Sequence, residues 1–218
     1  FGLVLASIFL VSKRIVKWDG KDVFFLMFFT AVAYVLVGLV SFETATTPLA
    51  FVLAGAIAIC AMILPGISGS FLLVIMGKYS QILAAVAERD FVTLGLVMIG
   101  IVLGLTLFSK LLSWLFQHYH DIVVASLTGF MIGSLRKIWP WKETITTRID
   151  SHGFEVPLLQ LNSLPQELNS EVLLAVALAI FAALFIIFLD KKALTKEHVE
   201  DLGSKQFTKE HAKALKNQ

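Results

Sequence analysis

The sequence predicts an all-α polytopic membrane protein, and its composition is the first reason. Of the 218 residues, 57% are hydrophobic and only 16% are charged, and the charges collect in short islands between uncharged stretches. Soluble domains of this length do not carry so much apolar surface, whereas bundles of membrane helices do. The formal net charge of +2 gives no electrostatic basis for a nucleic-acid partner, so the expected surroundings are membrane lipids.

We expect a transmembrane domain over residues 1–189, followed by a polar cytoplasmic tail over residues 190–218. A helix rises about 1.5 Å per residue and the hydrocarbon core is about 30 Å thick, so about 20 apolar residues make one span. The chain begins inside an apolar run and without a methionine, and we therefore expect its N-terminal part to be missing. The predicted spans are residues 1–12 as a partial span, 23–42, 91–116, the short or tilted 122–135, and 172–189.

The stretch of residues 48–77 is the exception, because it contains 30 consecutive uncharged residues with Pro-Gly-Ile-Ser-Gly-Ser at its centre. One straight helix of that length measures about 45 Å, more than the hydrocarbon core requires. Proline and the two glycines also disfavour a continuous helix. We predict two helical pieces, residues 49–64 and 71–87, which form a broken or re-entrant hairpin around an irregular loop.

The charges in the loops favour a hairpin that returns to the side from which it enters. With a hairpin, 12 basic residues lie on one side of the membrane and 6 on the other, compared with 10 and 8 if the stretch crosses once. The positive-inside rule prefers the larger asymmetry. It predicts that residues 11–22 and the tail lie in the cytoplasm and that residues 142–170 form an external loop.

The loop at residues 65–70 is the strongest candidate for a binding site. Irregular backbone survives at membrane depth only where it is buried in protein or faces a watery cavity. Glycine N–H groups, serine hydroxyls and the N-terminus of the following helix together suit a phosphate or a carboxylate. The alternative is structural: Pro65 and Gly66 kink a helix, Gly66 and Gly69 allow close packing of a neighbour, Ser68 is a turn residue and Ser70 an N-cap.

Two motifs resemble the DUF368 family of bacterial and archaeal membrane proteins. The first is Leu-Pro-Gly-Ile-Ser-Gly-Ser at residues 64–70 with Gly-Lys-Tyr at 77–79, and the second is Gly-Phe-Met-Ile-Gly-Ser-Leu-Arg-Lys-Ile-Trp-Pro-Trp at 129–141. The resemblance covers about residues 1–189. It implies half of an inverted-repeat transporter that returns a polyprenyl phosphate, such as undecaprenyl phosphate, across the cytoplasmic membrane of a bacterium or archaeon. It also implies a second Pro-Gly-x-Ser-Gly motif nearer the N-terminus, which this chain lacks.

The resemblance implies which residues bind the lipid headgroup. Arg136 is the expected side-chain cation, although a basic residue at the end of a span also meets ordinary lipid headgroups. Lys78 either reaches the phosphate or extends to the membrane interface. Glu43 is a candidate for proton coupling or a plain interface carboxylate. The positions that match the family's phosphate motif are Pro65, Gly66, Ser68, Gly69 and Ser70.

No catalytic residue, metal site or cofactor is predicted, because no histidine within the membrane segments has an acidic or arginine partner in sequence and no carboxylates cluster. A non-enzymatic transporter is therefore the expected class, with an integral-membrane lipid phosphatase or phosphotransferase, or a small-anion channel, as the alternatives. The spacing Gly100 to Gly104 and Gly129 to Gly133 lets helices approach closely, either within the chain or in a homo-oligomer.

Overall fold

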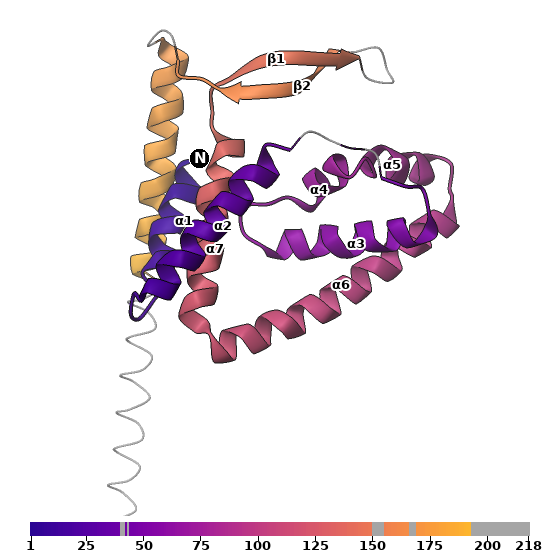
Figure 1. Ribbon diagram of the computed structural model, residues 1–218. Coiled ribbons are helices and arrows are strands. Elements are labelled where there is room, and N and C mark those ends of the chain that lie inside the picture. The colour runs from indigo at the N-terminus through magenta and orange to yellow at the C-terminus, as the bar shows by residue number, and fades with distance from the viewer. Residues whose placement is uncertain (40–41, 43, 150–154, 166–168, 193–218) are drawn as a thin grey trace, which may run out of the picture.

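The computed structural model describes residues 1–39, 42, 44–149, 155–165 and 169–192 (Figure 1). Within these residues, an additional unlabelled helix, Ser170–Lys192, follows the labelled elements. The labelled elements are α1 (Gly2–Ser12), α2 (Gly20–Val37), α3 (Pro48–Ile63), α4 (Gly69–Ile75), α5 (Tyr79–Ala87), α6 (Phe91–His118), α7 (His120–Ile138), β1 (Lys142–Ile149) and β2 (Glu155–Asn162).

The starts of three helices follow from local sequence. Asp19 caps α2 in a reciprocal capping box with Asp22. The Thr47 side chain caps α3 and Pro48 occupies its first turn, where a missing N–H costs nothing. The Asp90 carboxylate accepts hydrogen bonds from the backbone N–H groups of Val92 and Thr93 at the start of α6. These caps place the helix boundaries close to the polar residues that interrupt the apolar runs.

Helices α2 and α7 run parallel and pack through glycine. A Cβ atom on Gly129 would lie 2.4 Å from the Leu26 carbonyl oxygen, and one on Gly133 would lie 2.5 Å from the Thr30 carbonyl oxygen. Contacts therefore advance together along both helices, and only glycine permits so close an approach. Helix α1 runs antiparallel to α7, because Phe1 meets Trp139 at its start and Val11 packs near Val124 at its end.

Helices α3 and α6 form a second parallel pair by the same means. A Cβ atom on Gly100 would lie 2.0 Å from the Val52 carbonyl oxygen, and one on Gly104 would lie 2.7 Å from the Ala56 backbone. The alternative in which the two small-residue motifs serve packing within the chain is thus confirmed for both. The described residues give no information on a homo-oligomer.

Because α3 and α6 are parallel, the chain that leaves the C-terminal end of α3 must return to the level of the N-terminal end of α3 before α6 begins. Helices α4 and α5 provide that return. The re-entrant hairpin expected from the sequence is therefore present. Its second arm differs from the expected single helix over residues 71–87, because α4 and α5 meet at an angle of 102°. Gly77, at φ +67°, makes this second break possible, since its left-handed backbone favours glycine.

Among the described residues, three helices are long and apolar enough to cross a membrane: α2, α6 and Ser170–Lys192. Counting the bent α4–α5 pair as one span raises the number to four. The all-α polytopic membrane fold is confirmed. Helix α7 does not meet the same criterion, because Asp121, Arg136 and Lys137 lie within its 19 residues. The predicted span over residues 23–42 extends past Val37, the last residue of α2. Residues 40–41 lie outside the described part of the chain.

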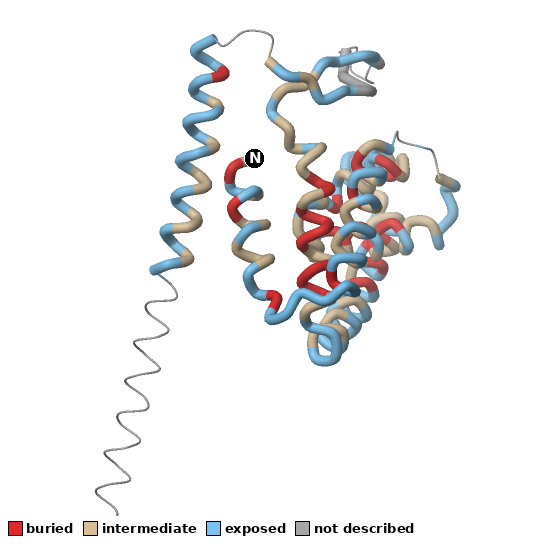
Figure 2. The backbone as a smooth tube through the Cα atoms, turned by 60° about the vertical axis from the view of Figure 1, so that its left-hand side comes forward, coloured by how far each residue is buried: buried red, intermediate tan, exposed pale blue. Residues whose placement is uncertain are grey.

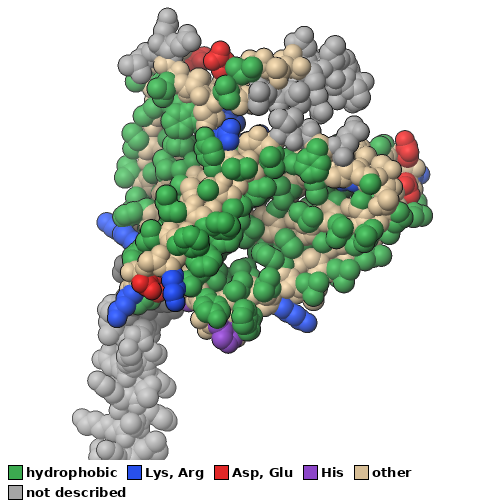
Figure 3. Space-filling model, in the orientation of Figure 1, with side chains coloured by type: hydrophobic (Ala, Val, Ile, Leu, Met, Phe, Trp, Pro, Cys, Tyr) green, Lys and Arg blue, Asp and Glu red, His purple; other side chains and the backbone are tan. Residues whose placement is uncertain are grey.

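Most of the buried positions hold small residues, and many large apolar side chains face outward. Ala33 and Ala125 are 0% exposed and Ala54 is 1% exposed, whereas many leucines and phenylalanines are exposed. Hydrophobic side chains cover the surface drawn in Figure 3. Figure 2 shows the buried residues along α7 and its neighbours, with helix Ser170–Lys192 exposed along most of its length. This distribution suits helices that pack through small residues within lipid.

The region expected as a loop at 142–170 contains an antiparallel hairpin of β1 and β2. Its base is held to the end of α7, because Trp139 Nε1 donates to the Ser163 carbonyl oxygen at 2.8 Å and Asn162 donates to the Arg136 carbonyl oxygen at 3.0 Å. Residues 143–147 of β1 are all exposed, and the β-branched residues Thr144, Ile145 and Thr146 suit a strand. The side of the membrane on which this hairpin lies stays a prediction.

Candidate functional site

The irregular loop between α3 and α4 is held against the middle of α7. Leu64 ends α3 with an extended backbone. Gly66 has φ +91°, a backbone conformation that residues other than glycine rarely adopt. A Cβ atom on Gly66 would lie 2.4 Å from the Ser134 hydroxyl oxygen. Ser134 is itself buried and donates to the Met131 carbonyl oxygen at 2.8 Å. Glycine is therefore needed both for the turn and for the close approach to α7.

The two serines of the loop present their hydroxyl groups together at the surface. Ser68 and Ser70 are exposed, and their Oγ atoms lie 2.8 Å apart in a hydrogen bond. Gly69 between them is buried, because a Cβ atom there would lie 2.5 Å from the Ala58 carbonyl oxygen on α3. The close packing at Gly69 thus turns both neighbouring hydroxyls outward. Each hydroxyl bonds only to the other in the described contacts, which an incoming anion can replace.

Two consecutive cations at the end of α7 point to different neighbours. Arg136 donates from Nη1 to the Tyr34 carbonyl oxygen at 3.0 Å, and its guanidinium lies 4.4 Å from the centre of the Tyr34 ring. The ammonium of Lys137 lies 4.6 Å from the centre of the Phe71 ring, and Lys137 is exposed. Phe71 follows Ser70 directly, so Lys137 is the basic side chain in contact with the start of α4.

Lys137 was not among the residues that sequence reasoning assigned to the site. The sequence shows the basic pair, but the 100° rotation between successive helical residues sends the two side chains to different partners. Which of them faces the loop depends on the angle at which α7 packs against α2. The contact between Lys137 and Phe71, 66 positions apart in the chain, supplies that answer.

Lys78 lies between α4 and α5 and is 0% exposed. Its ammonium donates to the Ala45 carbonyl oxygen at 2.7 Å, to Gln81 Oε1 at 2.8 Å and to the Thr44 carbonyl oxygen at 3.4 Å. It also lies 4.5 Å from the centre of the Phe51 ring. Three protein oxygens match the three hydrogens of the ammonium. This geometry favours a structural role for Lys78 over the predicted phosphate contact.

Glu43, the candidate for proton coupling, lies outside the described residues. Among the described residues, no group of three or more His, Cys, Asp or Glu side chains lies close enough to hold a metal ion. His120 pairs with its neighbour Asp121 at 2.9 Å, and the Asp121 carboxylate also accepts from the backbone N–H groups of Val16 and Lys17. This contact ties the turn before α2 to the start of α7.

Comparison with known proteins identifies the family. Residues 1–156 match a family model described as undecaprenyl phosphate translocase-like. The chain belongs to this family. The resemblance that the two motifs indicate is thereby confirmed, and the matched region includes the loop of residues 65–70 and the whole of α7.

Two curated relatives carry the same printed name. A polyprenyl-phosphate transporter of Vibrio cholerae is 41% identical over 199 residues, which cover 88% of this chain and 65% of the relative. A polyprenyl-phosphate transporter of Staphylococcus aureus is 33% identical over 96 residues, which cover 41% of this chain and 34% of the relative. The chain thus spans less than two thirds of the length of these relatives. No solved structure matches it.

Proposed function

We propose that this chain takes part in moving a polyprenyl phosphate, such as undecaprenyl phosphate, across the cytoplasmic membrane of a bacterium or archaeon. Two relatives are named polyprenyl-phosphate transporters, and both names describe transport rather than turnover. The family membership and the membrane helices support the proposal. The phosphate is bound at the loop of residues 65–70, which we call the serine loop.

The exposed hydroxyl pair of Ser68 and Ser70, at a break between apolar helices, carries the proposal. A phosphate entering the protein loses water, and its oxygens need donors that replace that water. The two hydroxyls lie 2.8 Å apart, close enough for both to donate to one phosphate. Unwound segments between half-helices bind the polar parts of substrates in other transporters by the same physics.

Lys137 and Arg136 supply the positive charge in this proposal. Lys137 stands over the ring of Phe71, the residue after Ser70, and in this proposal its exposed ammonium balances the phosphate charge. Arg136 lies one residue earlier and presents a planar donor fork on the side of α2. Hydrogen bonds to an ionised group are about twice as strong as neutral ones. Pro65, Gly66 and Gly69 shape the backbone that holds the hydroxyls.

Only the headgroup has to leave lipid during such a movement, because the prenyl chain is as apolar as the membrane core. A charge that crosses a potential of about 100 mV gains or loses about 2.3 kcal/mol. The membrane potential or a coupled proton can therefore set the direction of transport. Glu43 stays the predicted proton site.

Binding of undecaprenyl phosphate to the purified chain tests the site. We expect Ser68→Ala combined with Ser70→Ala to weaken binding about tenfold, the equivalent of about 1.4 kcal/mol, and Lys137→Gln to weaken it by a similar factor. Ser80→Ala with Thr106→Ala is the matched control, since both residues are exposed and neither belongs to the loop. Equal affinity of the loop variant and the control would contradict the proposed site.

Movement of a fluorescent polyprenyl phosphate across liposomes that contain the protein tests the activity. Transport is expected with the unmodified chain and is expected to fall with the loop variant. Release of inorganic phosphate from the same lipid would instead indicate a phosphatase or phosphotransferase. Ohmic anion current without lipid movement would indicate a channel. Either result would overturn the transporter proposal.

A further inference from the structure

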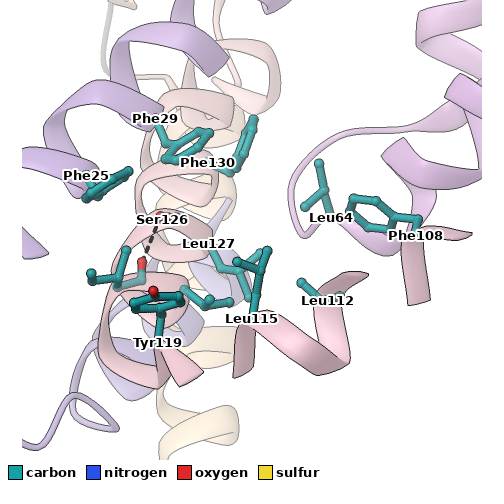
Figure 4. Close-up of a pocket in the computed structure, with 12 residues that line it drawn as sticks. Phe25, Phe29, Leu64, Phe108, Leu112, Leu115, Tyr119, Ser126, Leu127 and Phe130 are labelled. Atoms are coloured by element: carbon teal, nitrogen blue, oxygen red, sulfur yellow. Dashed lines mark hydrogen bonds between the residues drawn. The ribbon is translucent and has the colours of Figure 1, made fainter. Parts of the chain in front are cut away.

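A cavity of about 520 Å³ lies between α2, α6 and α7, beside the end of α3. Figure 4 shows its residues facing one another across an open space, with Leu64 and Phe108 opposite Leu127 and Phe130. The face drawn in Figure 3 is hollowed in the region between α6 and α7. Binding pockets for small ligands usually measure about 300–1,000 Å³, so this cavity is large enough for part of a lipid chain.

The walls of the cavity are almost entirely hydrocarbon. Ten of the twelve lining residues have side chains without a polar atom, and the exceptions are Tyr119 and Ser126. The Ser126 hydroxyl donates to the Ile122 carbonyl oxygen of its own helix at 2.7 Å, as the dashed line in Figure 4 shows. Apolar cavities of this kind exclude water and accept apolar ligands. The chemistry of the walls therefore selects a hydrocarbon occupant.

The cavity reaches the residue that precedes the serine loop. Leu64 lines the cavity and precedes Pro65, the first residue of the loop. On the opposite wall, Phe130 lines the cavity and precedes Met131, whose Cα lies 3.4 Å from where a Cβ on Gly66 would stand. Pro65 at the start of the loop and Met131 on α7, which faces Gly66, are thus each one residue from the lining of the apolar cavity.

This connection distinguishes a polyprenyl phosphate from an ordinary phospholipid. In a polyprenyl phosphate, a single hydrocarbon chain begins at the phosphate itself, so head and first isoprene units occupy adjoining sites. In a diacyl phospholipid, a glycerol unit separates the phosphate from two chains. A cavity that begins beside the headgroup loop matches a lipid whose chain begins at the phosphate. Five aromatic rings on the walls provide a large contact area at low cost in conformational entropy.

We propose that the cavity between α2, α6 and α7 binds the first isoprene units of the polyprenyl phosphate whose headgroup is held by the serine loop. The inference rests on the proposed function and deepens it, since it names the part of the protein that recognises the chain. It assigns Leu64, Phe108, Leu115, Leu127 and Phe130 to chain recognition, with no role in contacting phosphate.

Filling the cavity tests the inference with two soluble probes. Farnesyl phosphate carries three isoprene units, and dimethylallyl phosphate carries one. Leu115 lines the cavity two helical turns beyond Phe108, so Leu115→Trp fills its distal part. We expect this variant to bind farnesyl phosphate about tenfold more weakly, through loss of apolar contact area, and to bind dimethylallyl phosphate as the unmodified chain does.

Leu111→Trp is the matched control, because Leu111 lies one turn earlier on α6 and is 50% exposed. It is expected to leave both affinities unchanged. If Leu115→Trp does not fold, Leu127→Phe fills the cavity from α7 and must show the same selective loss. Size-exclusion profiles in detergent report whether each variant is folded.

The outcomes separate this inference from the proposed function. If the unmodified chain binds both phosphates and Leu115→Trp loses neither, the serine loop stands and the cavity inference is wrong. If Leu115→Trp sheds co-purified phospholipid but keeps its affinity for farnesyl phosphate, the cavity is a general lipid site and the inference is also wrong. If the unmodified chain binds neither phosphate, the proposed function and the inference both fail.

Discussion

The segment between α3 and α6 is interrupted twice, and the two breaks treat their polar groups in opposite ways. At the first break, the serine loop leaves the hydroxyls of Ser68 and Ser70 exposed and paired only with each other. At the second, between α4 and α5, Lys78 is fully buried and bonds to three protein oxygens. Both breaks use a glycine with positive φ, Gly66 and Gly77.

The difference separates a structural break from a candidate binding site. Polar groups at membrane depth must find partners within the protein or in a cavity. Lys78 finds all of its partners in the chain and joins the segment before α3 to α5. The two hydroxyls of the serine loop bond only to each other in the described contacts, and Lys137 contacts Phe71, the residue after the loop. A ligand is therefore expected to bind at the first break, whereas the contacts of Lys78 at the second break are expected to stabilise the fold.

The largest expected effect on stability comes from Gly66→Ala. An alanine at φ +91° is strained by about 1–3 kcal/mol, and its Cβ would meet Ser134 Cβ at 2.9 Å. We expect a loss of about 3 kcal/mol when the crowding is added to the strain, measured by thermal or denaturant unfolding in detergent. Gly95→Ala is the control, since a Cβ there meets nothing within 4 Å. Equal stability of the two variants would show that the loop does not pack on α7.

The next effect in size is expected for Lys78→Met. The substitution keeps an apolar chain of similar length but leaves the oxygens of Thr44, Ala45 and Gln81 without their donor. An unpaired buried polar group costs about 1–3 kcal/mol, and water reaching the exposed Ala45 reduces this, so we expect a loss of about 2 kcal/mol. Lys110→Met, at an exposed lysine of α6, is expected to change little. If phosphate-lipid affinity falls while stability stays constant, Lys78 is a ligand and the contrast between the breaks is wrong.

A smaller effect is expected for Gly77→Ala. The backbone at φ +67° is left-handed, which costs an alanine about 1 kcal/mol. The loss should therefore be about a third of that for Gly66→Ala, and lipid binding should be unchanged because the ligand is expected at the other break. The same unfolding assay, run beside a binding titration, measures both. Weaker lipid binding at constant stability would count against the assignment of the two breaks.

The smallest effect on stability is expected for Ser68→Ala with Ser70→Ala. Exposed substitutions away from special features change stability by less than about 0.5 kcal/mol. The unfolding transition should therefore coincide with that of the unmodified chain, although binding weakens. A clear drop in stability would mean that the hydroxyls hold the loop together, which is the structural alternative for these residues.

The structure also shows which parts of the fold follow from sequence pattern. The break at Pro65 and Gly66 was predictable, because an uncharged run too long for one span contains residues that disfavour a helix. The break at Gly77 was not, since a single glycine is compatible with a helix, and the partners that hold Lys78 at this turn lie about 33 residues earlier in the chain. The β1–β2 hairpin was likewise missed, because its register depends on anchoring to α7.

The sequence by itself determined the membrane class, the family and the position of the serine loop, since these depend on composition and on short contiguous motifs. Tertiary structure decided which basic residue lies at which of the two breaks. Lys137 approaches Phe71, and Lys78 turns inward, through contacts between segments 33 to 66 residues apart. The physical reason is that helix rotation and glycine-mediated approach set side-chain direction. Neither property is visible until the helices are packed together.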